Sequence, residues 1–203
     1  MKKKVKDTKQ IDTKIVDFDD KKTLHSIYKL RYQGFIIEEH IEPLNKYPNK
    51  ELFDDYDKYG IHICSMCNNE VLGSVLIVLR KNTNKFAFEE IYKIDEIPQN
   101  SSELRRLVIN SRFVKHNFLY RAEIIKNLME KMKEVMINNE INYAYMVCRK
   151  KYLKMYKKIG FKEVKAAKKM KKNEGKYLMY IDFSENEPNE ILGISKLEKK
   201  NDL

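Results

Sequence analysis

The chain of 203 residues is poor in several residue types: it has no tryptophan, three cysteines, four prolines and six glycines. Three cysteines are too few, and odd in number, for a disulfide scaffold, so we expect a reduced protein of the cytoplasm. No stretch approaches the ~18–20 apolar residues that a membrane-spanning helix needs. The basic start Met1-Lys2-Lys3-Lys4-Val5-Lys6 is not followed by an apolar run, which argues against a secretory signal.

Residues that bind metals are also sparse. Cys64 and Cys67 form a lone C-x-x-C, and Cys148 stands apart from them. A structural zinc site would need two more ligands at matching spacing. The histidines show no paired spacing; they are His25, His40, His62 and His116. We therefore expect no metal site, and we expect the cysteines to be free thiols in a reduced core.

Positive charge is abundant and local. The formal net charge is +11, from 41 Lys and Arg residues against 30 Asp and Glu residues. Residues 149–176, the basic block, contain 13 of the cations and only Glu163 and Glu174 as acids, so they hold the whole excess. Such a block suits an acidic partner, which could be a protein, a nucleic acid or an anionic membrane surface. A solvated lysine face without a partner is an equal alternative.

Nucleic-acid binding is the main alternative to an enzyme. Tyr152, Tyr156 and Phe161 lie within the basic block and could stack on bases. However, the chain carries no helix-turn-helix or RNA-binding signature, which disfavours this alternative.

The hydrophobic pattern predicts one α/β domain over residues 14–183, between a flexible segment 1–13 and a polar tail 184–203. We expect a mixed central sheet with helices on both faces, because strands and helices alternate in the second half. Asp19 or Asp20 is expected to cap the first helix, which should extend to about His40. The predicted strands are 14–18, 60–66, 71–80, 103–110, 141–148, 161–166 and 177–183, and the other predicted helices are 119–138 and 151–159.

Charged residues recur at fixed offsets in otherwise apolar elements. Burying an unpaired charge is costly, so such residues are expected to pair with each other or with a substrate. The ordered set, which includes one aromatic residue, is Arg31, Phe35, Asp54, Asp57, Arg80, Glu103 and Arg106.

The segment Leu153–Phe161 resembles the last helix of the GNAT superfamily of N-acyltransferases. In that superfamily a tyrosine four residues before a Gly-Phe pair commonly protonates the departing thiolate, and Tyr156 precedes Gly160-Phe161 in this way. The resemblance implies a GNAT-like sheet and a general-acid role for Tyr156. The alternative is a tyrosine whose ring simply fills the core.

The ordered charged set narrows the resemblance to acyl-homoserine-lactone (autoinducer) synthases and the related N-acyl amino acid synthases. These enzymes transfer an acyl group from a thioester to a primary amine. The resemblance implies that Glu103 is the base and that Arg106 keeps it ionised or oriented. Residues three apart on a strand point to opposite faces, so this pair can meet only across a bulge. An exposed ion pair is the alternative.

The same resemblance implies that Arg31, Asp54, Asp57 and Arg80 form one network that fixes the first helix and the following loop over the cleft and holds the amine. A purely structural salt-bridge network is the alternative. Phe35 is expected to wall the acyl tunnel, with Phe86, Phe88 and Met146. Main-chain groups of Leu107, Val108 and Ile109 are expected to bind the pantetheine arm and to polarise the thioester carbonyl.

The acyl donor is expected to be an acidic acyl carrier protein rather than coenzyme A. Acyl-CoA enzymes of the superfamily carry a glycine-rich turn around the pyrophosphate, whereas residues 112–121 contain no glycine. A carrier-protein thioester presents a single phosphate, which Arg112 could meet. The acyl thioester is thus a co-substrate, and no permanently bound cofactor is expected.

Two further alternatives stay open. One is an acetyl-CoA-dependent GNAT enzyme that acts on a small amine or a protein, and the other is a binding module that kept the fold without the chemistry. The acceptor amine is also open, because lactone synthases have a tryptophan-containing segment and this chain has no tryptophan.

Overall fold

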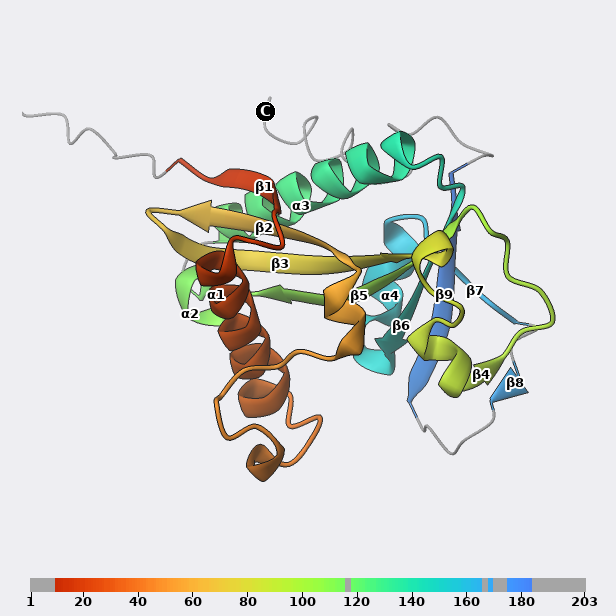
Figure 1. Cartoon of the computed structure of the whole chain (residues 1–203), viewed down its shortest axis with the longest axis horizontal. Coiled ribbons are helices and arrows are strands. Elements are labelled where there is room, and N and C mark those ends of the chain that lie inside the picture. The colour runs from red at the N-terminus through yellow and green to blue at the C-terminus, as the bar shows by residue number, and fades with distance from the viewer. Residues whose placement is uncertain (1–9, 116–117, 166–167, 170–174, 184–203) are drawn as a thin grey trace, which may run out of the picture.

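The computed structural model describes residues 10–115, 118–165, 168–169 and 175–183. Most of the predicted flexible start and the whole predicted polar tail lie outside these ranges. A seven-stranded mixed sheet forms the centre, in the order β1-β2-β3-β5-β6-β9-β7 (Figure 1). Its strands are β1 (Asp12–Val16), β2 (Ile61–Cys67), β3 (Glu70–Leu79), β5 (Ser101–Ile109), β6 (Tyr143–Arg149), β7 (Lys162–Glu163) and β9 (Lys176–Asp182).

Helices cover both faces of this sheet, as predicted (Figure 1). Helix α1 (Lys21–Arg31) continues into a π-helix (Tyr32–Glu38) and lies over β3 and β5. On the other face lie α3 (Phe118–Asn138), which packs on β2 and β3, and α4 (Lys150–Lys158), which packs on β6 and β9. Within the described ranges, no helix combines the length and the apolarity that a membrane crossing requires.

Short elements complete the chain. Helix α2 (Ser111–Val114) precedes α3, and the strands β4 (Tyr92–Lys93) and β8 (Lys168–Lys169) pair in a separate two-stranded sheet. The 3-10 turns are Leu44–Lys46, Asp55–Lys58, Arg80–Asn82 and Ala87–Glu90.

Local chemistry explains several boundaries. The side chain of Asp20 accepts a hydrogen bond from the Thr23 N–H at 3.0 Å and so caps α1, as predicted. Asn68 and Asn69 join β2 to β3 with φ values of 50° and 65°, the left-handed conformation that a tight hairpin turn requires. Cys64, Cys67 and Cys148 are buried free thiols, as expected.

Two predicted elements differ from the structure. The first helix has α geometry only to Arg31, because the following seven residues adopt π-helical hydrogen bonding. The closing hairpin is shorter than predicted: its pairing ends where the Val164 N–H donates to the Leu178 carbonyl, and Lys168–Lys169 pair with β4 instead.

The strands β5 and β6 run parallel but part early. Only Ser101–Glu103 pair with Tyr143–Tyr145, although both strands continue beyond these residues. On its other side, β5 carries a bulge against β3, because the register passes from Leu76 opposite Arg105 to Ser74 opposite Val108. Arg106 lies in this bulge with φ of 56°, in the left-handed region. The sheet therefore opens between β5 and β6.

The π-helix approaches β5 closely at Gly34. A Cβ atom at Gly34 would lie 2.5 Å from Cγ2 of Val108, closer than carbon atoms can approach. Glycine at this position lets the helix backbone lie directly against the strand that carries the bulge.

We predict that Gly34→Ala lowers the free energy of unfolding by about 1–2 kcal/mol, because the overlap outweighs the better helix propensity of alanine. In a Val108→Ala background the overlap is removed, so the same change should be neutral or stabilising by up to about 1 kcal/mol. Urea unfolding of the four proteins in this double-mutant cycle measures the difference. Equal effects in both backgrounds would contradict the contact.

Candidate active site

A cavity of about 370 Å³ lies in the opening between β5 and β6. Both strands line it, together with α3, α4, the residues that follow the π-helix and the turn Ala87–Glu90. Its wall carries titratable groups from different elements, among them Glu39, Glu103, Arg105, Arg106 and Tyr156.

Glu103 is the most deeply buried acid on this wall, with 3% of its surface exposed. Its Oε2 accepts a hydrogen bond from the Ala87 N–H at 2.8 Å, and Nη1 of Arg105 lies 4.0 Å away. Burial raises the pKa of Glu103 to about 7, although Arg105 and the Ala87 and Phe88 N–H groups pull it down. A carboxyl with this pKa can accept a proton near neutral pH.

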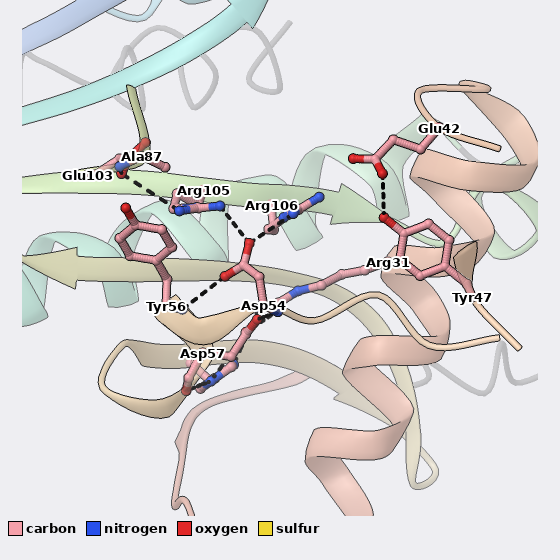
Figure 2. Close-up of polar contacts among 11 residues, drawn as sticks. Arg31, Glu42, Tyr47, Asp54, Tyr56, Asp57, Ala87, Glu103, Arg105 and Arg106 are labelled. Atoms are coloured by element: carbon pink, nitrogen blue, oxygen red, sulfur yellow. Dashed lines mark hydrogen bonds and ion pairs between the residues drawn. The ribbon is translucent and has the colours of Figure 1, made fainter. Parts of the chain in front are cut away.

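Two consecutive arginines converge on one acid beside Glu103 (Figure 2). Nη2 of Arg105 and Nη2 of Arg106 lie 2.7 and 3.0 Å from the same Oδ2 atom of Asp54. Neighbouring side chains on a regular strand point to opposite faces, so this convergence depends on the left-handed Arg106 in the bulge.

The predicted bulge is therefore present, but it does not join the predicted pair. The partner of Glu103 is Arg105, whereas Arg106 contacts Asp54 and lies 5.9 Å from the ring centre of Phe35. The bulge turns the Arg106 side chain toward the loop before β2, away from Glu103.

Arg31 and Asp57 form a buried ion pair that ties α1 to the same loop. Asp57 also accepts the N–H of Asp54 at 2.8 Å, which links this pair to the two arginines on β5. His62 extends the cluster by a contact of 3.4 Å between its Nδ1 and Nη2 of Arg31. Neither Arg31 nor Asp57 lines the cavity, so the pair braces the loop that carries Asp54.

Arg80 does not join this network, contrary to the prediction. It pairs with Glu89, which also accepts the Phe86 N–H at 2.5 Å. The reason is that β3 ends at Leu79, and Arg80 lies in the 3-10 turn beyond it. Arg80 thus braces the turn whose Ala87 N–H binds Glu103.

Tyr156 lies on α4 and reaches the cavity, with its ring edge-on to Phe161 at 5.7 Å. Burial raises the pKa of its phenol above the ordinary value, so the hydroxyl keeps its proton at neutral pH. No side chain among the described residues hydrogen-bonds to this hydroxyl, which leaves the O–H free to donate to a ligand.

The expected pantetheine and acyl residues divide between the cavity and its surroundings. Leu107, Phe35, Phe88 and Met146 line the cavity. The other four do not: Val108 packs beneath the π-helix, Ile109 packs at the edge of the main core, Phe86 is fully buried and Arg112 is exposed on α2.

Glu39 is a cavity residue that the sequence does not reveal. Its carboxylate accepts hydrogen bonds from Arg149 at 2.7 Å, Lys151 at 2.5 Å and the Tyr152 hydroxyl at 2.7 Å. Burial raises the pKa of Glu39, but the bonds from Lys151 and Tyr152 and the two cations outweigh this and hold the pKa below its ordinary value. The cluster joins the end of the π-helix to β6 and α4, more than 100 positions later.

The fold is that of the GNAT-type acyltransferases. The chain is similar to the crystal structure of the AHL synthase LasI, with a TM-score of 0.68 and 19% identity over 92% of this chain and 96% of that one. It is also similar to a CoA-dependent acyl-homoserine lactone synthase, MesI, with a TM-score of 0.65 and 13% identity over 89% and 91% of the two chains. A GNAT-family acetyltransferase from Staphylococcus aureus Mu50 has a TM-score of 0.56 and 14% identity over 86% and 99%.

The family is settled by sequence. The family described as N-acyl amino acid synthase FeeM matches residues 26–182, and the chain belongs to it. No curated protein matches the chain. The resemblance to the synthases and to GNAT enzymes is confirmed, and the protein is an N-acyltransferase of this type.

The raised pKa of Glu103 predicts a measurable cost in stability. Between its ordinary value of 4.5 and about 7, the folded state binds more protons than the unfolded state, so stability falls as pH rises. Glu103→Gln removes this loss. The free energy of unfolding of the variant minus that of the wild type should rise by up to roughly 3 kcal/mol from pH 4.5 to pH 8, as measured by urea unfolding.

Glu39→Gln is the matched control, because the pKa of Glu39 is shifted the opposite way. The ionised Glu39 carboxylate stabilises the fold fully above the pKa that this group has in the unfolded chain, and the contribution is lost as pH falls. This variant should therefore be destabilised at pH 8 and approach the wild type in acid. A Glu103→Gln difference that does not vary with pH would contradict the raised pKa.

Proposed function

We propose that the protein transfers a long acyl group from an acyl carrier protein to the primary amine of an amino acid or its derivative. The observation that carries the proposal is the cavity between β5 and β6, with Glu103 and Tyr156 on its wall. The family to which the chain belongs supports an amino acid as the acceptor.

The two residues suit the two proton transfers of the reaction. An amine attacks a thioester carbonyl only when neutral, and the proton that it gives up passes to Glu103 directly or through water. As the C–N bond forms and the C–S bond breaks, the Tyr156 hydroxyl donates its proton to the departing thiolate. Beyond Glu103 the main chain of β5 is unpaired with β6, so its polar groups can bind the pantetheine arm and the carbonyl oxygen.

The cavity also suits a long acyl chain. Met129, Met132 and Met146 line its apolar part. Unbranched methionine side chains adjust readily to a flexible alkyl chain. An enzyme that transfers only an acetyl group would have no use for this lining.

Two features favour a carrier protein as donor. Bulky residues of α2, such as Arg112 and Phe113, stand where a glycine-rich pyrophosphate turn would be needed. In addition, α4 exposes Lys150, Lys154 and Lys158 on the helix that carries Tyr156 to the cavity. In the proposed complex, an acidic carrier docks on these lysines of α4.

We predict that kcat/KM for a long-chain acyl carrier protein exceeds that for the matching acyl-CoA, with an amino acid acceptor and N-acyl product measured by mass spectrometry. Lys154→Glu with Lys158→Glu should raise KM for the carrier protein, and more so at low salt, while KM for acyl-CoA changes little. Turnover of acetyl-CoA but not of the long-chain carrier would overturn the proposed donor.

We predict that Glu103→Gln lowers kcat/KM by about 10²–10⁴, because the amine loses its base. For the wild type, activity should fall as pH drops below about 7, since a base must be ionised to act. The variant's residual activity should lack this decline. Wild-type activity in Glu103→Gln would remove the residue from the reaction.

Tyr156→Phe should slow transfer from pantetheine thioesters but not from an acyl thioester of an aromatic thiol, because a thiol of low pKa departs without protonation. Tyr152→Phe is the matched control. It lies one turn earlier on α4, and its hydroxyl is bonded to Glu39. Its rate should not depend on the leaving group in this way. The same dependence in both variants would contradict the acid role.

A further inference from the structure

We propose that Arg105, and not Arg106, is the positioning residue that controls whether Glu103 is ionised, and that Asp54 and Tyr56 hold its guanidinium in place. The inference rests on the proposed function in one respect: it affects catalysis only if Glu103 is the base.

The geometry separates the two arginines. Nη1 of Arg105 lies 4.0 Å from Oε2 of Glu103, too far for a hydrogen bond but close enough for a strong electrostatic attraction in a buried site. Arg106 has other partners, namely Asp54 and the ring of Phe35. Among the described residues, only the guanidinium of Arg105 therefore lies within ion-pair distance of the Glu103 carboxylate.

Arg105 is held on two sides (Figure 2). Its Nη2 donates to Asp54 at 2.7 Å, and its guanidinium lies 4.2 Å from the ring centre of Tyr56. Asp54 is fixed in turn, because it accepts the Tyr56 N–H at 3.0 Å and donates its own N–H to Asp57. A planar guanidinium suits this arrangement, since it can stack on a ring and bond a carboxylate at once.

Within the described part of the chain, the nitrogen that faces Glu103 is a buried donor without a hydrogen bond. Nη1 of Arg105 is buried and has no hydrogen bond among the described residues, although Arg105 lines the cavity. A buried donor without an acceptor is costly, so its retention needs a reason. The reason that fits is the negative charge that Glu103 acquires when it loses its proton.

The other groups around Glu103 cannot replace Arg105. The Ala87 and Phe88 N–H groups favour the carboxylate, but Asp54 disfavours it and burial disfavours it most. The Tyr56 phenol nearby has a pKa raised by burial and by Glu103, to about 12, so it is neutral. Arg105 is the cation that keeps the Glu103 carboxyl able to ionise near neutral pH.

The test is a titration of the Glu103 carboxyl in the full chain, followed by NMR with ¹³C-labelled glutamate, with Glu103→Gln to assign the signal. The wild-type midpoint should lie near pH 7. Arg105→Gln should raise it by about 1–3 pH units, the usual effect of losing a neighbouring cation. Arg106→Gln is the matched control, because it removes the other guanidinium that binds the Asp54 carboxylate. It should leave the midpoint of Glu103 near the wild-type value.

An unchanged midpoint in Arg105→Gln, or an equal shift in Arg106→Gln, would overturn the proposal. Should Arg105→Gln fail to fold, Arg105→Met takes its place, because it keeps an apolar side chain of similar reach and removes the charge. An upward shift in that variant supports the proposal and an unchanged midpoint overturns it.

The pH profile of kcat/KM separates this inference from the function on which it rests. The decline of activity in acid should move upward with the NMR midpoint in Arg105→Gln. If Glu103→Gln keeps full activity, Glu103 is not the base. The NMR titration then still tests whether Arg105 controls the ionisation of Glu103. If Glu103→Gln is inactive and Arg105→Gln leaves the midpoint unchanged, only the positioning role fails.

Discussion

Strands β5 and β6 separate after three paired residues, and the cavity with its charged wall lies where they separate. Up to Glu103 the two strands share hydrogen bonds, and beyond it their main chains diverge around the cavity. The bulge at Arg106 accompanies this divergence, and it also turns two consecutive arginines toward one acid. One local departure from strand geometry thus supplies both the opening and the charges along its edge.

Buried charge is the second theme, and Asp54 connects its parts. Through Asp57 it is joined to Arg31 on α1, and through its own carboxylate to the arginines of β5. These paired groups satisfy one another, which is how charges persist in an interior. Glu103 differs, because the effect of burial outweighs that of its partners and raises its pKa to about 7. An acid of this kind destabilises the folded state at neutral pH, a cost that fits a site built for proton transfer.

The periodic elements were predicted well because their signals are local. The apolar pattern over residues 119–138 predicted α3, and Ile124, Leu128, Met132 and Val135 of that segment are buried in the main core. The predicted helix 151–159 contains Tyr156, and the structure places this residue on α4. Arg80 was assigned to the wrong partner, because its distance from Glu89 depends on how the chain turns after β3. Glu39 escaped notice since its partners follow more than 100 residues later.

The amino-acid pattern was enough to predict the class of fold, most strands and helices, and a set of charged residues that have to be paired once buried. The pairing itself was decided by the tertiary structure. Both Arg105 and Arg106 stand close to Glu103 in sequence, and strand alternation alone places Arg105 on its face. The resemblance pointed instead to Arg106, and the left-handed backbone at that residue sends it to Asp54. Contacts between distant segments depend on the summed packing of the whole chain, which no local pattern contains.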